Sequence, residues 1–179
     1  MPFIALAVGV LLAAIDQIIK YFVVTDLKPV GTVNVLGEVF RLTYVENPGV
    51  AFGMFAGKQW IFIILTAVLL ALIIFYMFKK RPKSKLFYIT VAMIIGGGIG
   101  NLIDRVLYRY VVDYLSFSFF PPVCNFADYC ITIGVFLLAF YLLFLADRET
   151  KGEADKAAEE AEESAKAEEA EEEEDNGDD

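Results

Sequence analysis

The sequence predicts a mainly α-helical integral membrane protein, with four transmembrane helices and a small extracytoplasmic β-sheet or hairpin region. Hydrophobic residues make up 58% of the 179-residue chain, which is more than in ordinary soluble domains. Four stretches are long and apolar enough to span a bilayer, and one stretch between the first two alternates as strands do. The predicted spans are residues 3–24, 60–78, 86–106 and 128–146, and the predicted β region is residues 32–46.

Charge divides the chain into two parts. Of the 24 acidic residues, 17 lie in residues 147–179, together with four of the 15 basic residues. This segment contains no aromatic residue and no valine, leucine or isoleucine, so it cannot bury enough apolar surface to offset its ordering entropy. We therefore predict a four-helix transmembrane domain at residues 1–146 and an acidic, disordered cytoplasmic tail at residues 147–179.

Basic residues predict the orientation in the membrane. Lys79–Lys85 contains five positive charges in seven residues and connects the second and third spans. Short cytoplasmic loops carry such an excess of lysine and arginine. The N- and C-termini are then cytoplasmic, and the loops at residues 25–59 and 107–127 lie on the outer side.

The first outer loop carries a strand pattern. Residues 33–35 lead to a turn at residues 36–38, which contains a glycine, and Phe40, Leu42 and Tyr44 then occupy alternate positions. Alternation with a period of two around a glycine turn is typical of a β-hairpin.

The composition excludes several kinds of site. The chain has no histidine, which removes Ser-His and Cys-His catalysis and the commonest zinc ligand. Its two cysteines, Cys124 and Cys130, are too few for a disulfide framework or a four-cysteine metal site. We expect no metal, no cofactor and no nucleic-acid partner.

Polar residues share one face in two of the spans. Asp16 and Lys20 are four residues apart in the first span, and they suit either a simple ion pair or a brace directed toward a site. Asn101 and Asp104 share a face of the third span in the same way. Four glycines within residues 96–100 lower helix propensity, which indicates that another segment passes close to this backbone.

Two further aspartates flank the second outer loop. Asp113 has apolar neighbours in the sequence and no structural explanation, whereas Asp128, at the start of the fourth span, suits either a helix N-cap or a functional site. Two carboxyl groups held together in a partly desolvated place tend to share one proton, so that one serves as base and the other as acid. Such a pair activates water without histidine. The rival nucleophiles, Ser116 and Ser118, would need a lysine as base, and nothing in the spacing connects them to Lys20.

Five short motifs follow one another along the chain. They are DQIIK at 16–20, NPGVAF at 47–52, GGIGNLIDR at 97–105, VVDY at 111–114 and NFAD at 125–128. Together they resemble the motifs of the lipoprotein signal peptidases (signal peptidase II, peptidase family A8), bacterial membrane enzymes that remove signal peptides from prolipoproteins. The resemblance covers nearly all of residues 1–146. It departs at Cys124, where phenylalanine is usual, and it does not extend to the acidic tail.

The resemblance implies an aspartic endopeptidase of the bacterial cytoplasmic (inner) membrane, with its active site at the outer leaflet. Its substrates would be prolipoproteins, cut before the diacylglyceryl-modified cysteine of the lipobox, and its other partners would be membrane lipids and the inhibitor globomycin. The catalytic pair would be Asp113 and Asp128. The supporting and substrate-binding residues would be Asp16, Lys20, Asn47, Gly49, Asn101, Asp104, Arg105, Asn125 and Ala127.

The alternative function is that of a non-catalytic polytopic membrane protein for lipid binding or transport. Such a protein would use the polar faces of the first and third spans. It would tolerate the loss of Asp113 and would be insensitive to globomycin.

Overall fold

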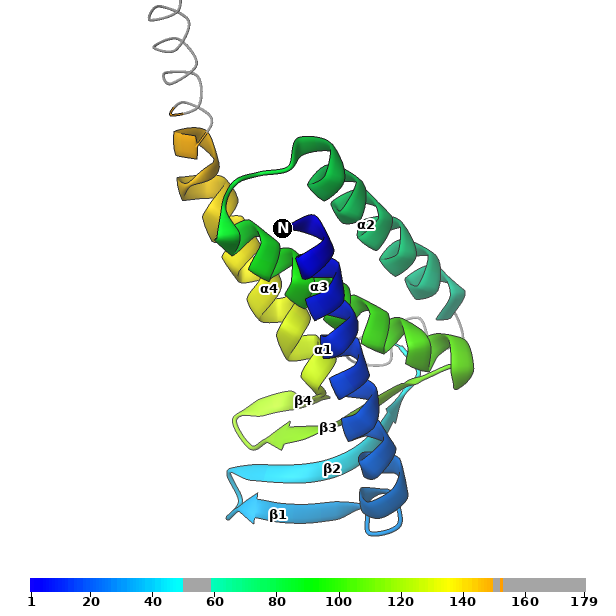
Figure 1. The fold of residues 1–179 in the computed structure, drawn as a ribbon. Coiled ribbons are helices and arrows are strands. Elements are labelled where there is room, and N and C mark those ends of the chain that lie inside the picture. The colour runs from blue at the N-terminus through cyan, green and yellow to red at the C-terminus, as the bar shows by residue number, and fades with distance from the viewer. Residues whose placement is uncertain (50–58, 150–151, 153–179) are drawn as a thin grey trace, which may run out of the picture. The chain divides into compact units, whose positions relative to one another are not determined.

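Long helices and one small sheet make up the protein (Figure 1). The computed structural model describes residues 1–49, 59–149 and 152. Within the chain, Met1–Leu138 forms one compact unit and Ala139–Asp179 a second. Residues 50–52 of the NPGVAF motif, and nearly all of the segment predicted to be a disordered acidic tail, lie outside the described residues.

Four helices in the described part of the chain are long and apolar enough to cross a membrane, as the sequence predicts. The first span is longer than predicted because a π-helical segment, η1, continues helix α1 without a break. The elements are α1 (Pro2–Phe22), η1 (Val23–Leu27), α2 (Gln59–Lys80), α3 (Lys85–Leu107) and α4 (Phe126–Phe144).

Helix α3 is the central helix of the fold. In its most apolar stretch 61% of the residues are buried, compared with 11% in α2. Its glycines allow this close packing: a Cβ added at Gly96 would lie 2.6 Å from Cβ of Leu12 in α1, and one at Gly98 would lie 2.9 Å from Leu70 in α2. Small residues let helix backbones approach closely in a membrane protein. The expectation that other segments pass close to these glycines is confirmed.

A four-stranded antiparallel sheet is attached to one end of the helices (Figure 1). The predicted hairpin forms strands β1 (Thr32–Leu36) and β2 (Phe40–Asn47). A second hairpin, β3 (Val111–Phe117) and β4 (Phe120–Cys124), pairs with it through β2 and β3. No strand is predicted from the sequence in this second outer loop. Its strand signal is weak because β4 contains two prolines, which are uncommon in strands.

An apolar cluster holds the sheet against the end of α1. Val23 and Leu27 of η1 pack against Val112 and Tyr114 of β3, and all four side chains are buried. This apolar cluster therefore fixes β3, the strand that carries Asp113, relative to the first span.

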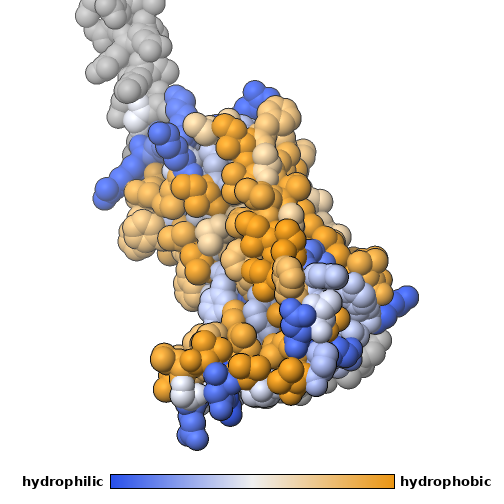
Figure 2. Space-filling view, turned by 60° about the horizontal axis from the view of Figure 1, so that its bottom comes forward, coloured by the Kyte–Doolittle hydropathy of each residue, from blue (hydrophilic) through white to orange (hydrophobic). Residues whose placement is uncertain are grey.

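Figure 2 shows hydrophobic residues over the long helices and a group of hydrophilic residues at the end that carries the sheet.

Candidate active site

Asp113 lies on β3 and its carboxylate is almost completely enclosed by protein, with 2% of the residue exposed. Its two oxygens each accept a hydrogen bond from an asparagine amide. Asn47 Nδ2 donates to Oδ2 at 2.8 Å, and Asn125 Nδ2 donates to Oδ1 at 2.6 Å. Among the described residues no cationic group lies at hydrogen-bond distance, so burial makes this carboxyl group easier to protonate than one in water.

Asp128 lies in the first turn of α4, three residues after Asn125. The Asp128 backbone N–H donates to Asn125 Oδ1 at 2.9 Å, and the Asn125 N–H donates to Asp128 Oδ2 at 3.1 Å. This reciprocal pair is a capping box. The interpretation of Asp128 as the N-cap is therefore wrong in detail, because Asn125 caps the helix and Asp128 is the third residue within it.

Asn125 contacts both aspartates at once. Its side-chain amide donates to Asp113, while its backbone N–H donates to Asp128. Asn125 is completely buried, so these bonds lie out of competition with water. The structure therefore brings the two predicted catalytic aspartates to one residue, from a strand and from a helix.

Three asparagines, Asn47, Asn101 and Asn125, each point their side-chain NH₂ group toward an aspartate. In each, the side-chain carbonyl oxygen accepts a hydrogen bond from an N–H donor, which fixes the NH₂ group in that direction. The Gly49 N–H donates to Asn47 Oδ1 at 3.1 Å, and Lys20 Nζ donates to Asn101 Oδ1 at 3.0 Å. Asn101 Nδ2 in turn donates to Asp128 Oδ1 at 2.8 Å. Both carboxylates are thus surrounded by donors whose direction is fixed by a second contact.

Lys20 is at the centre of a buried charge cluster between α1 and α3. Its Nζ lies 2.9 Å from Asp16 Oδ2 and 2.9 Å from Asp104 Oδ2, and it also donates to Asn101. The three ammonium donors are therefore matched by three acceptors. A buried charge of this kind is tolerated because it is both paired and hydrogen-bonded.

The two acids of this cluster also accept hydrogen bonds from the backbone next to Asp113 and Asp128. Asp104 Oδ2 accepts from the Val112 N–H at 3.0 Å, and Asp16 Oδ1 accepts from the Ala127 N–H at 3.0 Å. Glycines make room for these contacts. A Cβ at Gly100 would lie 2.5 Å from Asp16 Oδ2, and a Cβ at Gly97 would overlap the Ala127 carbonyl oxygen.

Arg105 adds positive charge near Asp113 and Asp128. Its Nη1 donates to the Asn101 carbonyl oxygen at 3.1 Å, and its guanidinium lies 5.9 Å from the centre of the Phe62 ring. Its charge interacts with those of Asp113 and Asp128. The guanidinium is therefore held at the edge of the site by a backbone bond and an aromatic face.

The electrostatics of Asp113 follow from its position in the sheet. Burial is the main cause that raises its pKa from 3.8 to about 6, and the negative charge of Asp128 raises it further. The hydrogen bonds from Asn47 and Asn125 act in the opposite direction, because they stabilise the ionised form. The net effect is that the pKa of Asp113 moves toward neutral pH.

Two residues of the site were not assigned from the sequence, although both lie within the quoted motifs. Gln17 Nε2 donates to Asp104 Oδ1 at 2.9 Å and to the Gly100 carbonyl oxygen at 3.1 Å. The Tyr114 hydroxyl accepts a hydrogen bond from the Phe126 N–H at 3.2 Å. Their positions within DQIIK and VVDY make Gln17 and Tyr114 candidates for site residues, but only the contacts in the structure show what each side chain binds.

The described residues contain no group of three or more histidine, cysteine, aspartate or glutamate side chains arranged to hold a metal ion. The serine alternative also lacks a base. Lys20 is already engaged by three acceptors, and Ser116 lies opposite Arg41 in the sheet. Among the charged and polar groups described, the pair Asp113 and Asp128 is the arrangement suited to moving protons.

One known family matches most of the chain. Residues 8–144 match the family described as signal peptidase (SPase) II. The chain belongs to the signal peptidase II family. The family match therefore covers three of the four apolar helices in full and the first from residue 8 onward, and it includes Asp113, Asp128 and the residues that contact them.

Individual relatives match this chain over a similar length. A lipoprotein signal peptidase of Caldanaerobacter subterraneus subsp. tengcongensis is 43% identical over 78% of this chain and 96% of its own length. One from Clostridium acetobutylicum is 39% identical over 83% of this chain and 97% of its own. A bacterial membrane enzyme solved by the in meso method at 2.3 Å resolution is similar in fold, with a TM-score of 0.72 and 30% identity over 78% of this chain and 87% of that chain.

Proposed function

We propose that this signal peptidase II is an aspartic endopeptidase, which removes signal peptides from prolipoproteins by cleaving before the diacylglyceryl-modified cysteine of the lipobox. The proposed catalytic residues are Asp113 and Asp128. The observation that carries the proposal is the hydrogen bonding of one buried asparagine, Asn125, to both carboxylates.

The proposed reaction requires one proton on the dyad. The ionised carboxylate takes a proton from water, and the water oxygen attacks the carbonyl carbon of the scissile peptide bond. The protonated carboxyl group stabilises the carbonyl oxygen as it becomes negative. The carbon–nitrogen bond then breaks, and a proton passes to the leaving amine, which restores a singly protonated pair.

The supporting residues have distinct proposed roles. Asn47, Asn101 and Asn125 orient the carboxylates, and Gly49 fixes the orientation of Asn47. Arg105 is placed to bind the substrate backbone or lipid head group. The brace formed by Asp16, Lys20, Asp104 and the Ala127 backbone holds the two dyad segments in position.

The proposed location is the bacterial cytoplasmic membrane, with both termini in the cytoplasm and the dyad at the outer leaflet. The basic segment Lys79–Lys85 supports this orientation, and the dyad lies near the ends of α3 and α4 that carry the sheet. A diacylglyceryl-modified cysteine would keep its acyl chains in the bilayer and present its peptide bond at that depth. Membrane lipids are thus partners of the proposed reaction.

The structure gives the transport and lipid-binding alternative less support. The polar groups on the faces of α1 and α3 bind one another, with Lys20, Asp16, Asp104 and Gln17 in a single closed cluster. A transport route would need polar groups available to a passing solute. The dyad aspartates, in contrast, are grouped outside this cluster.

Cleavage of a lipid-modified prolipoprotein, followed by gel shift, tests the proposal. The variants Asp113→Asn and Asp128→Asn should each lose cleavage while still inserting in the membrane. Asp26→Asn is the matched control, because this aspartate is exposed on η1 and, among the described residues, forms no hydrogen bond or ion pair with Asp113 or Asp128. Full cleavage by either dyad variant would refute the assignment of the catalytic pair.

Globomycin provides an independent test of the proposed family chemistry. We expect it to inhibit cleavage and to raise the melting temperature of the wild-type protein, since a ligand of the folded state stabilises that state. A globomycin-resistant protein that still cleaves prolipoproteins would contradict the proposed inhibitor but not the catalytic pair.

A further inference from the structure

The end of the helix bundle opposite the sheet contains a groove between α1 and α3. The groove has a volume of about 270 Å³ and is lined almost entirely by apolar side chains. Ala5 and Ala92 form its buried floor, with 3% and 2% of their surfaces exposed, and the larger Ile4, Val8 and Ile89 form its exposed rim. The groove exists because small residues occupy both facing helices.

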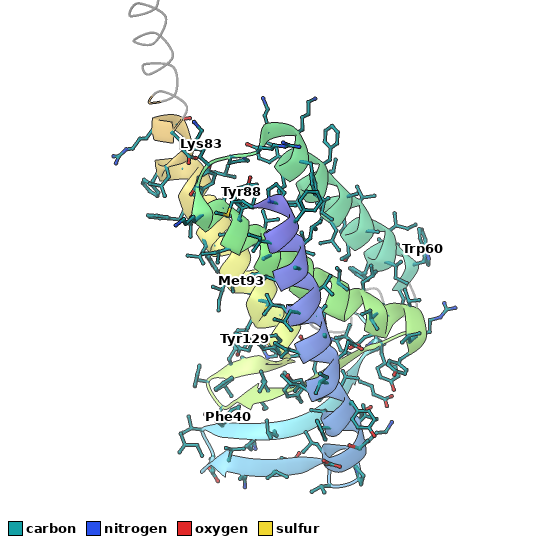
Figure 3. The ribbon with its side chains drawn as sticks, in the orientation of Figure 1. Phe40, Trp60, Lys83, Tyr88, Met93 and Tyr129 are labelled. Atoms are coloured by element: carbon teal, nitrogen blue, oxygen red, sulfur yellow. The ribbon has the colours of Figure 1, made fainter. Side chains whose placement is uncertain are left out.

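One side of the groove is a straight track along α3. Lys85, Ile89 and Met93 follow one another at intervals of four residues, so they lie on one helical face. Eight residues of helix extend for about 12 Å. Figure 3 shows Tyr88 and Met93 on α3 beside the N-terminal part of α1. The track is apolar along its length and has a lysine at its end.

Positive charge gathers at the same end of the groove. Lys85 is exposed, and it belongs to the basic segment Lys79–Lys85 that connects α2 and α3. Basic pockets between transmembrane helices bind anionic lipid head groups, and each nearby lysine or arginine adds to that affinity. The groove therefore combines an apolar track with a cationic mouth.

We propose that this groove binds one acyl chain of an anionic phospholipid from the leaflet on the side of Lys79–Lys85, with Lys85 paired to the head-group phosphate. The size of the groove favours a single chain over a protein helix, because stable protein interfaces bury roughly 800 Å² on each partner. Two small alanines form its floor, and the space above them is narrow enough for a single flexible hydrocarbon chain. This site is at the opposite end of the helices from the dyad and is independent of the peptidase reaction.

Native mass spectrometry of the full chain, after reconstitution in nanodiscs of equal phosphatidylglycerol and phosphatidylcholine, tests the site. The wild-type protein should retain phosphatidylglycerol in preference to phosphatidylcholine. Lys85→Gln should reduce that retention about fivefold. Val8→Trp should fill the groove and abolish it. Ile89→Trp, on the opposite rim, is a second filling variant if Val8→Trp does not fold, because both side chains are substantially exposed.

Two control variants separate this site from general attraction to lipid. Lys79→Gln removes an equally basic residue that lies over the Phe75 ring of α2, and Leu72→Trp adds an indole to an exposed position of α2 outside the groove. Lys79 does not line the groove, so Lys79→Gln should reduce retention less than Lys85→Gln does, and Leu72→Trp should retain phosphatidylglycerol as the wild type does. Equal retention of the two lipids, equal losses in the controls, or a dimer of this chain in place of a lipid adduct would overturn the proposal.

Discussion

The backbone N–H of Val112 donates a hydrogen bond of 3.0 Å to Oδ2 of Asp104. Val112 directly precedes Asp113 on β3, so a carboxylate in the third span fixes the position of the strand that carries the first dyad aspartate. The same oxygen lies 2.9 Å from Lys20 Nζ. The cluster between α1 and α3 is therefore connected to the sheet through one oxygen atom.

Asp104→Ala should strongly reduce both stability and cleavage. The change removes the acceptor for Val112 and leaves the Lys20 charge with fewer partners, and breaking a buried pair on one side costs about 3–5 kcal/mol. Asp104→Asn keeps an oxygen acceptor and should be less severe. Melting temperature and single-turnover cleavage rate measure the two effects. Normal cleavage by the alanine variant would show that β3 does not depend on this carboxylate.

Gly100→Ala should lower stability and cleavage more than Gly98→Ala. The added Cβ at Gly100 meets the Asp16 carboxylate at 2.5 Å, whereas at Gly98 it meets the flexible end of Leu70 at 2.9 Å. Overpacking in a fixed cluster costs roughly 1–3 kcal/mol, and a leucine end can move aside. The two variants are matched in chemistry and in helix. Equal melting temperatures would mean that the Asp16 carboxylate has room to move.

Asn125→Ser should separate helix capping from the orientation of the dyad. Serine is also a good N-cap, so the first turn of α4 should be retained and the melting temperature should fall less than in Asn125→Ala. The side-chain NH₂ that binds Asp113 at 2.6 Å is lost, so the cleavage rate should fall sharply. Asn125→Ala, which removes both functions, is the reference variant. A fully active serine variant would show that the amide is needed only as a cap.

Stability should depend on pH through Asp113, whose pKa is raised from 3.8 to about 6 in the folded state. Between these pH values the folded protein binds more protons than the unfolded chain, so stability falls as pH rises from about 4 to about 6. The loss is at most about 3 kcal/mol. This contribution of Asp113 should be absent in Asp113→Asn. Melting temperatures of both proteins at pH 4, 5, 6 and 7 measure the difference, and parallel curves would contradict the raised pKa.

The sequence predicted the parts of the fold that depend on local pattern. The four apolar runs specify the spans because length and hydrophobicity are sufficient to recognise a membrane helix. The alternation around Gly37 specified the hairpin β1–β2 in the same way. The second hairpin was missed because Pro121 and Pro122 conceal β4. A strand of this kind is recognisable only through its pairing with β3.

The sequence singles out polar residues that the structure brings together, but it does not predict the contacts between them. Helical spacing placed Asp16 beside Lys20, because contacts four residues apart need no tertiary information. The direction of each asparagine amide, in contrast, depends on tertiary contacts. Asn101 turns its NH₂ toward Asp128 only because Lys20 occupies its oxygen, and that contact joins segments that are 81 residues apart. The sequence contains no local signal for it.

Asp16 and Ala127 are 111 residues apart in the chain, yet a 3.0 Å hydrogen bond joins them. During synthesis the first span therefore enters the bilayer long before the last one exists. Lys20, one turn from Asp16, offsets the charge of that aspartate in the meantime. A nascent chain that lacks its final span has neither the Asp128 carboxylate nor the backbone that Asp16 will bind. If Asp128 is catalytic, as proposed, the membrane intermediate becomes an assembled site only when the polypeptide is complete.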